Sequence, residues 1–372
     1  MKTSLLLKRT CRYLCFLFLL PLFSFAQQSS RPFTVGIQSY YGFLLRHKPA
    51  LGGITQGHPF GAELYYEGIK AGQQYWEKAY HYPSVGFALG YFDMHSPKIG
   101  QMIYVLHYLE KDLAKGNKGA LKLKLGYGLA YCTHPFNLED NYQNIAISTR
   151  LSYALRTALG YSIALSDNLK LHLGLTITHF SNGSFKIPNS GTNLVMANLG
   201  LSFTPQSKKI IYQTVALPPA FSKKWIVNLS AAFIIKEFDL PGGRKYPGMV
   251  LMANLSRRLN YKSAINIGLD GAYNTALREE INRDSTIDPE HKPDFKRVGL
   301  VVGHELFFNE RLSLLTQVGV YIYKHYTSNI DAPIYQRYGL RYHMNKRLFG
   351  TMSLKSHFGT ADFVEWTVGV NL

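Results

Sequence analysis

The residues best suited to chemistry are a histidine and a serine two positions apart, His179 and Ser181, which close a strongly alternating segment. If this segment is a β-strand, both side chains point to the same face, with Cα atoms roughly 6.5 Å apart. An imidazole nitrogen can then reach the serine hydroxyl, which is the minimal arrangement of an activated nucleophile. Spacing alone does not establish this chemistry, because a His-x-Ser triplet arises easily by chance and polar residues return wherever a strand ends.

The pair continues an apolar row of residues. Leucine or isoleucine occupies every second position from Leu169 to Ile177, and the alternate positions are polar or small. In a membrane-embedded barrel such a row faces lipid, while the other row faces the lumen. We therefore expect His179 and Ser181 to lie on the outer face, where the apolar wall meets the lipid head groups.

Alternation with a period of two recurs along the whole chain and predicts an all-β fold. Aromatic residues make up 14% of the sequence and charged residues only 17%, which suits a membrane barrel with aromatic girdles. Alternating strands also build soluble sandwiches, but we expect an antiparallel transmembrane β-barrel of the outer membrane, with about 16 strands and 12 to 16 possible. The predicted strands lie at 33–45, 61–70, 84–94, 99–109, 119–132, 144–164, 169–181, 192–204, 225–238, 247–259, 262–274, 296–308, 312–325, 333–344, 347–358 and 364–372.

The connections between these segments alternate in length, as in outer-membrane barrels, whose periplasmic turns are short and extracellular loops long. Short polar turns occur at 166–168, 309–311 and 345–347, and long loops at 46–60, 133–143, 239–246 and 275–295. The stretch 205–224 interrupts this rhythm with prolines and lysines, as a long connection or as a linker between two half-domains. We interpret residues 27–372 as a single barrel.

The N-terminal residues 1–26 have the pattern of a cleaved secretory signal peptide. Basic residues precede an apolar stretch, and Ser24 and Ala26 supply the small residues of a cleavage site before Gln27. A retained anchor or a lipoprotein signal are the alternatives. Cleavage would leave Cys132 as the one cysteine of the exported chain, so no internal disulfide is expected.

The formal net charge is +18, which usually indicates an anionic partner. Nucleic acid is a poor candidate for an exported barrel, whereas the phosphates of an outer-leaflet glycolipid would suit basic residues in outer loops. Motifs for nucleotides, zinc proteases and the nucleophile elbow are absent, so no metal or organic cofactor is implied. The basic residues placed in outer loops are Arg46, Lys48, Lys186, Arg244 and Lys245, although ordinary surface charge is the better explanation for any one of them.

An extended motif adds to this interpretation: His179-Phe180-Ser181-Asn182 is followed by Pro188-Asn189-x-Gly191. This motif, within residues 169–204, resembles the signature of the lipid A 3-O-deacylase family of outer-membrane barrels, and the whole chain resembles larger acyloxyacyl hydrolase-like proteins. The resemblance implies an outer-membrane serine esterase that removes an acyl chain from lipid A (lipopolysaccharide) in the outer leaflet. It also implies Ser181 as nucleophile, His179 as general base, and Asn182 with the Gly183 backbone N–H near the oxyanion.

The chain departs from the family at the third member of the triad, where Asn193 stands in place of a glutamate. An amide can orient an imidazole but gives no countercharge, and the comparable change in serine proteases costs on the order of 10⁴ in turnover. Three alternatives follow. Asn193 supports slow turnover, another acid such as Glu63, Glu305 or Glu365 comes close, or the protein is a non-catalytic barrel. The last would be a small-solute channel or a lipid-binding relative that has lost turnover.

Overall fold

The computed structural model describes residues 32–54, 56–205, 210–213, 221–238 and 240–372, so the predicted signal peptide 1–26 lies outside the described residues. The described chain forms antiparallel strands that close into barrels, as the alternation predicts. The strands are β1 (Phe33–Leu44), β2 (Phe60–Ile69), β3 (Ser84–Asp93), β4 (Gln101–Lys115), β5 (Gly119–Cys132), β6 (Leu151–Ala164), β7 (Leu169–Ser181), β8 (Thr192–Phe203), β9 (Trp225–Glu237), β10 (Lys245–Arg258), β11 (Ser263–Asn274), β12 (Arg297–Phe307), β13 (Leu312–Lys324), β14 (Ile334–His343), β15 (Leu348–His357) and β16 (Thr360–Asn371).

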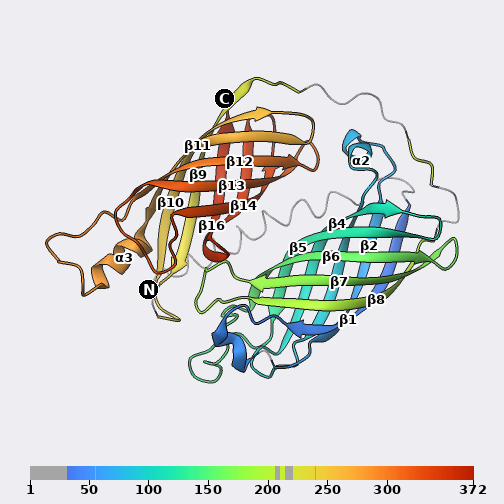
Figure 1. The fold of residues 1–372 in the computed structure, drawn as a ribbon, viewed down its shortest axis with the longest axis horizontal. Helices are drawn as coiled ribbons and strands as arrows, with labels where there is room; N and C mark the ends of the chain where they lie inside the picture. The colour runs from blue at the N-terminus through green and yellow to red at the C-terminus, as the bar shows by residue number, and fades with distance from the viewer. Residues whose placement is uncertain (1–31, 55, 206–209, 214–220, 239) are drawn as a thin grey trace, which may run out of the picture.

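The expectation of a single 16-stranded barrel is wrong, because the strands close into two separate barrels of eight (Figure 1). In the first barrel (β1–β8), β8 pairs back to β1, with Leu194 opposite Leu44. In the second barrel (β9–β16), β16 pairs back to β9, with Trp366 opposite Phe233. Alternation is a local pattern and is the same in either architecture, so it does not determine which strands close the sheet.

Three predicted strand boundaries also differ clearly from the structure, and one of them is the start of β16, which lies at Thr360 and not at 364. Residues 144–150 form part of a loop, since the Asn144 side chain accepts hydrogen bonds from the backbone N–H groups of Ala146 and Ile147 and holds a turn. β4 continues past the predicted end at 109 to Lys115, where its charged residues pair with β5.

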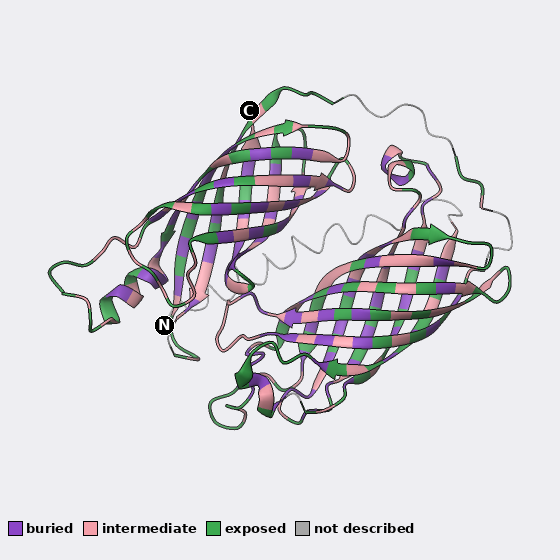
Figure 2. Cartoon of the chain, viewed as in Figure 1, coloured by how far each residue is buried: buried purple, intermediate pink, exposed green. Residues whose placement is uncertain are grey.

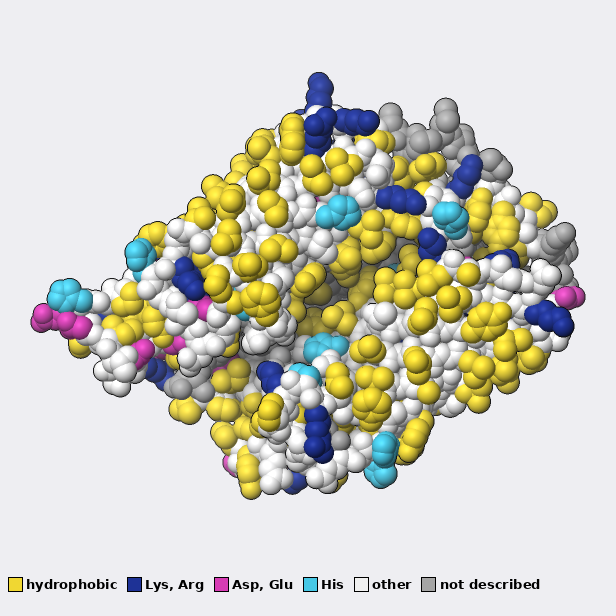
Figure 3. Space-filling view, in the orientation of Figure 1, with side chains coloured by type: hydrophobic (Ala, Val, Ile, Leu, Met, Phe, Trp, Pro, Cys, Tyr) yellow, Lys and Arg dark blue, Asp and Glu magenta, His cyan; other side chains and the backbone are white. Residues whose placement is uncertain are grey.

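The outer faces of both barrels are apolar and exposed, which is the reverse of a soluble protein. Figure 2 shows buried and exposed residues alternating along the strands. On β7, for example, Leu175 is 64% exposed while its neighbour Thr176 is 2% exposed. Figure 3 shows hydrophobic side chains spread over the visible face, where they also line a hollow between the two barrels. This surface identifies the fold as a pair of transmembrane barrels of the outer-membrane type.

The lumens of both barrels are filled by paired charges and aromatic rings, as expected where eight strands leave just enough room for side chains. In the first barrel, Arg156 forms an ion pair with Glu63, which also accepts hydrogen bonds from Tyr40 and Tyr104. In the second, the Arg337 guanidinium lies 2.7 Å from both Asp270 and Glu365. Each of these charges is nearly inaccessible to solvent and has an opposite charge beside it.

Among the described residues, three short helices lie outside the barrels: η2 (Pro49–Gly53), α2 (Tyr75–Ala79) and α3 (Thr275–Arg283). No helix in the described part of the chain is long and apolar enough to cross a lipid bilayer. The connection that carries α2 contacts the second barrel, because the Tyr80 hydroxyl donates a hydrogen bond to Phe307 O at 2.6 Å. Burial, with a smaller contribution from Tyr261, raises the pKa of Tyr80 to about 12, so this donor keeps its proton at neutral pH.

The lumen network generates a prediction about stability. Replacing Arg337 with leucine would leave Glu365 buried without its ion-pair partner and Asp270 with Lys355 alone nearby, and breaking a buried ion pair typically costs about 3–5 kcal/mol. We expect Arg337→Leu to lower the unfolding free energy of the second barrel by this amount, measured by urea denaturation in detergent micelles. Arg347→Leu, in an exposed turn, is the matched control. Equal midpoints for the two variants would contradict a stabilising role of the network.

Candidate functional site

His179 and Ser181 lie on the outer face of the first barrel, as the apolar row predicts. The alternate residues Thr178 and Phe180 point into the lumen and are 0% exposed, whereas Ile177, in the same row as the pair, is 54% exposed. Both His179 and Ser181 are partly buried. The structure records no hydrogen bond between them, and among the described residues the Ser181 hydroxyl has no recorded partner. The hydroxyl is therefore available to an incoming group.

Asn193 occupies the position opposite His179 where β8 pairs with β7. Its side-chain Oδ1 lies 2.6 Å from His179 Nδ1, so the amide is hydrogen-bonded to this nitrogen of the imidazole. Of the three alternatives for this position, replacement by one of the three carboxylates is excluded. Glu63 pairs with a lumen arginine of the first barrel, and Glu305 and Glu365 pair with lumen arginines of the second.

A second histidine, His47, which the sequence analysis did not single out, completes this group of side chains. Its Nδ1 lies 3.1 Å from Asn193 Nδ2, and its Nε2 lies 2.9 Å from Ser190 O. His47 follows β1, and it reaches the site because β1 pairs with β8 when the first barrel closes. A single large barrel would have separated β1 from β8, so the sequence offered no signal for this contact.

Gly191, the last residue of the Pro-Asn-x-Gly element, packs directly against the imidazole. A Cβ atom at this position would lie 2.8 Å from His179 Cε1, and the backbone φ of +72° is one that favours glycine. The backbone N–H of Gly191 donates to Ala146 O at 2.9 Å, which ties the segment to the loop before β6. The glycine therefore allows a close approach that fixes one side of the ring.

The two residues expected near the oxyanion, Asn182 and Gly183, differ in whether their N–H groups already have hydrogen-bond acceptors. The Asn182 side chain is 3% exposed and donates to Ser148 Oγ and Lys186 O, while its backbone N–H donates to Asn189 Oδ1 at 3.0 Å. Asn182 thus organises the loop and has no free N–H to offer. The backbone N–H of Gly183 has no recorded acceptor among the described residues, and its φ is +64°.

The loop that carries the motif, residues 182–191 (the motif loop), is attached to the second barrel. Ser184 Oγ donates to Ala361 O at 3.0 Å, and Ile187 N donates to Glu237 Oε2 at 2.7 Å. A Cβ on Gly183 would lie 2.3 Å from Val364 Cγ2. The starts of β16 and β10 and the end of β9 therefore form a support for the motif loop.

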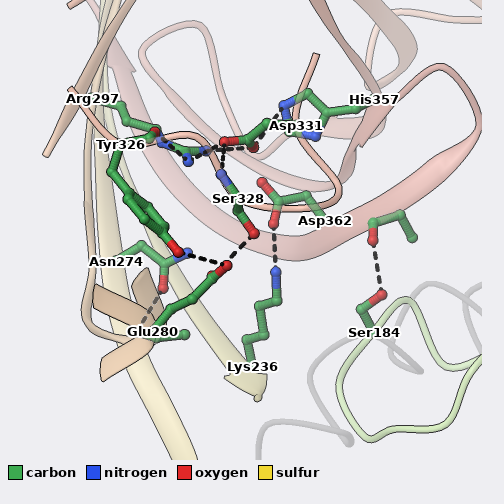
Figure 4. A network of polar contacts seen from close by, with 12 residues as sticks. Ser184, Lys236, Asn274, Glu280, Arg297, Tyr326, Ser328, Asp331, His357 and Asp362 are labelled. Carbon is green, nitrogen blue, oxygen red and sulfur yellow. Dashed lines mark hydrogen bonds and ion pairs between the residues drawn. The ribbon is translucent and has the colours of Figure 1, made fainter. Parts of the chain in front are cut away.

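Ion pairs of the second barrel stabilise the strand ends that contact the motif loop (Figure 4). Lys236, next to Glu237, forms an ion pair with Asp362 at 2.8 Å, which joins β9 to β16 beside Ala361. Farther along, Arg297 forms an ion pair with Asp331, whose Oδ2 also accepts the backbone N–H of Ser328 at 2.8 Å. The surface that receives the motif loop is thus held in place by charges on neighbouring strands.

The basic residues expected in outer loops fall into two groups. Arg46 and Lys48 flank His47 in the loop after β1 and are exposed. Lys186 belongs to the motif loop, and Lys245 of the second barrel lies 3.2 Å from the ring centroid of Phe185 beside it. Arg244 lies over Tyr246 at 5.8 Å. In the described part of the chain, no group of three or more His, Cys, Asp or Glu is arranged to hold a metal ion.

The contact between Gly183 and Val364 yields a prediction that does not depend on activity. Gly183→Ala would place a methyl group 2.3 Å from Val364 Cγ2 and should displace the motif loop. We expect faster tryptic cleavage after Lys186 in the folded protein, measured by mass spectrometry of the released peptides. Adding Val364→Ala should restore much of the protection, because it removes the methyl group in the way. If Gly183→Ala alone leaves cleavage unchanged, the motif loop is not held by this contact.

Comparison with known proteins follows this division into two barrels. The model of a family described as lipid A 3-O-deacylase (PagL) matches residues 61–202, and a model described as acyloxyacyl hydrolase, C-terminal domain, matches residues 224–372. A search of curated proteins finds no match.

Solved structures resemble the chain only distantly. Neisserial surface protein A (NspA) is 11% identical, with a TM-score of 0.31 over 46% of this chain and 96% of that one. The Pseudomonas putida toluene transporter TodX is 9% identical, with a TM-score of 0.17 over 93% of this chain and 88% of that one. Acinetobacter baumannii outer membrane protein Omp33 is 10% identical, with a TM-score of 0.17 over 93% and 99%. None of these similarities bears on function. The two family models together match most of the chain, and the protein therefore belongs to the PagL family of lipid A 3-O-deacylases with an acyloxyacyl hydrolase C-terminal domain.

Proposed function

We propose that the protein is a serine esterase of the outer membrane that hydrolyses an acyl ester of lipid A in the outer leaflet. The observation that carries the proposal is the position of Ser181 and His179 at the end of an exposed apolar row, beside an amide that holds the imidazole. Membership of the lipid A 3-O-deacylase family supports the substrate class.

The surroundings of the pair suit an ester at the base of an acyl chain. Leu173, Leu175 and Ile177 form an exposed apolar wall that leads along β7 to His179. Acyl chains that lie along this wall would bring their ester groups to the polar end of the strand, next to Ser181. Lys245, which lies over the Phe185 ring, and Lys186, the next residue of the motif loop, are suited to bind the phosphates of the same glycolipid.

In the proposed reaction, Ser181 Oγ attacks the ester carbonyl and its proton passes to His179 Nε2. The Gly183 N–H is the donor best suited to the oxyanion of the tetrahedral intermediate, since the N–H groups of Asn182 are occupied. The sugar oxygen then leaves with the proton from His179, and the acyl chain stays on Ser181. Water, activated through His179, hydrolyses this acyl-enzyme and regenerates the serine.

Asn193 orients the imidazole in this scheme but supplies no negative charge when the ring becomes protonated. We therefore expect slower turnover than a carboxylate at this position would allow. A lipid-binding protein without turnover is the second candidate, and the neutral Asn193 favours it. A small-solute channel is disfavoured by the filled lumens, in which Arg156 and Arg337 are 4% and 1% exposed.

Mass spectrometry of lipid A tests the proposed function directly. Cells that express the wild-type protein should accumulate lipid A lacking one ester-linked acyl chain, and Ser181→Ala should abolish this species. Ser202→Ala is a matched control, because Ser202 also lies beside a histidine, at 2.7 Å from His172 Nε2, but inside the lumen. Identical lipid A from folded wild-type protein and Ser181→Ala would reject the esterase and leave the lipid-binding candidate.

A further inference from the structure

We propose that His47 is a positioning residue of the site, which fixes the orientation of the Asn193 amide and thereby keeps His179 in the tautomer of a general base. This inference rests on the proposed function for its kinetic consequences. Its structural basis is a chain of three hydrogen bonds, from Ser190 O through His47 and Asn193 to His179.

The position of the proton on His47 follows from its neighbours. Ser190 O is a carbonyl and can only accept, so His47 Nε2, at 2.9 Å, must carry a hydrogen to bond it. A neutral imidazole has one N–H, which leaves Nδ1 as an acceptor. Leu45 O lies 3.2 Å from Nδ1, but the shorter contact to Ser190 O takes the single ring hydrogen to Nε2, so Nδ1 has none to donate to Leu45 O.

The orientation of Asn193 follows in turn. Because His47 Nδ1 accepts, the group of Asn193 that faces it at 3.1 Å must be the amide NH₂. The amide oxygen then faces His179 Nδ1 at 2.6 Å and can only accept, so Nδ1 carries the hydrogen. His179 Nε2 is left with a free lone pair, which is the form needed to take a proton from serine.

Without His47, two arrangements of the amide would compete. In one, the oxygen faces His179 as in the structure. In the other, the NH₂ donates to His179 Nδ1, so the imidazole hydrogen moves to Nε2 and the ring can no longer act as base. A carboxylate has two equivalent acceptor oxygens and needs no such partner. His47 is therefore needed to select one orientation only because the triad position is occupied by an amide.

Hydrogen bonds hold the backbone around His47, and they fix the groups that orient its imidazole. Ser190 N donates to Ile145 O at 3.1 Å, so the carbonyl that bonds His47 is held by the loop before β6. Leu45 N donates to Asn193 O at 2.8 Å, which ties the end of β1 to the start of β8. His47 itself is exposed and lies outside the residues matched by the deacylase family model, 61–202.

The first test compares variants of His47 with purified full-length protein and lipid A. His47→Phe keeps the ring but removes the acceptor, and we expect kcat to fall about tenfold with little change in KM, since one oriented hydrogen bond is lost. His47→Asn, which offers an amide oxygen near the place of Nδ1, should recover part of the loss. His58→Phe is the matched control, because His58 is another exposed histidine of the same loop and, among the described residues, contacts Gly42 O and the Tyr41 ring instead of Asn193.

The decisive comparison repeats His47→Phe in an Asn193→Asp background. A carboxylate accepts the His179 Nδ1 hydrogen in any orientation, so the effect of His47→Phe on kcat should vanish there. A merely structural role of His47 would lower kcat equally in both backgrounds and would overturn the inference. If wild type and Ser181→Ala are equally inactive, the proposed function fails, while the tautomer of His179 still tests the inference.

The tautomer of His179 can be measured whether or not the protein is active. The measurement uses ¹⁵N chemical shifts of labelled histidines in the full-length protein, and the His179→Gln variant assigns the signal. We expect the wild type to carry its His179 hydrogen on Nδ1. His47→Phe should shift part of the population to the Nε2–H form, and His58→Phe should not. A His179 signal that is the same in wild type and His47→Phe would overturn the proposal.

Discussion

The pairing of β8 with β1 is the constraint on which the site depends. It closes the first barrel after eight strands and sets Leu194 opposite Leu44. Three residues beyond Leu44, His47 then lies beside Asn193, and the imidazole of His179 gains a connected set of partners instead of one isolated amide. The His47–Asn193 contact crosses this seam and the Asn193–His179 contact crosses the neighbouring β7–β8 pair, so closure of the first barrel brings these three side chains together.

The filled lumens account for the position of the proposed site on the outer face. The interior of an eight-stranded barrel is just wide enough to be filled by side chains, and here it is filled by ion pairs such as Arg156 with Glu63. These buried charges have their partners inside, and none of the three lumen carboxylates considered for the triad reaches His179. A polar group that must meet a lipid has only the outer face available, at the level where the apolar row ends.

The sequence predicted much of this arrangement, and its failures have two physical causes, pairing between distant strands and the geometry of loops. The period of two located nearly all strands and the outward face of His179 and Ser181, because both are local properties of a strand. It did not predict two barrels, because closure depends on pairing between strands far apart in the chain. His47 was missed for the same reason, since its contact exists only if β1 and β8 are neighbours. The hydrogen bonds of Asn182 to Ser148 and Lys186 depend on the geometry of the loop, which the alternating pattern of the strands does not describe.

The second barrel gives the motif loop a surface on which to rest. A loop after a strand end has few contacts of its own, and the order of the Gly183 backbone would otherwise depend on the Asn182 hydrogen bonds alone. Instead, β9 and β16 supply Glu237, Ala361 and Val364, and the Lys236–Asp362 ion pair holds those two strands together at the same level. Because Gly183 has no room for a side chain against Val364, the fit between the barrels constrains the Gly183 N–H, for which the described residues supply no acceptor. The two halves of the chain, matched by two different family models, therefore meet at the motif itself.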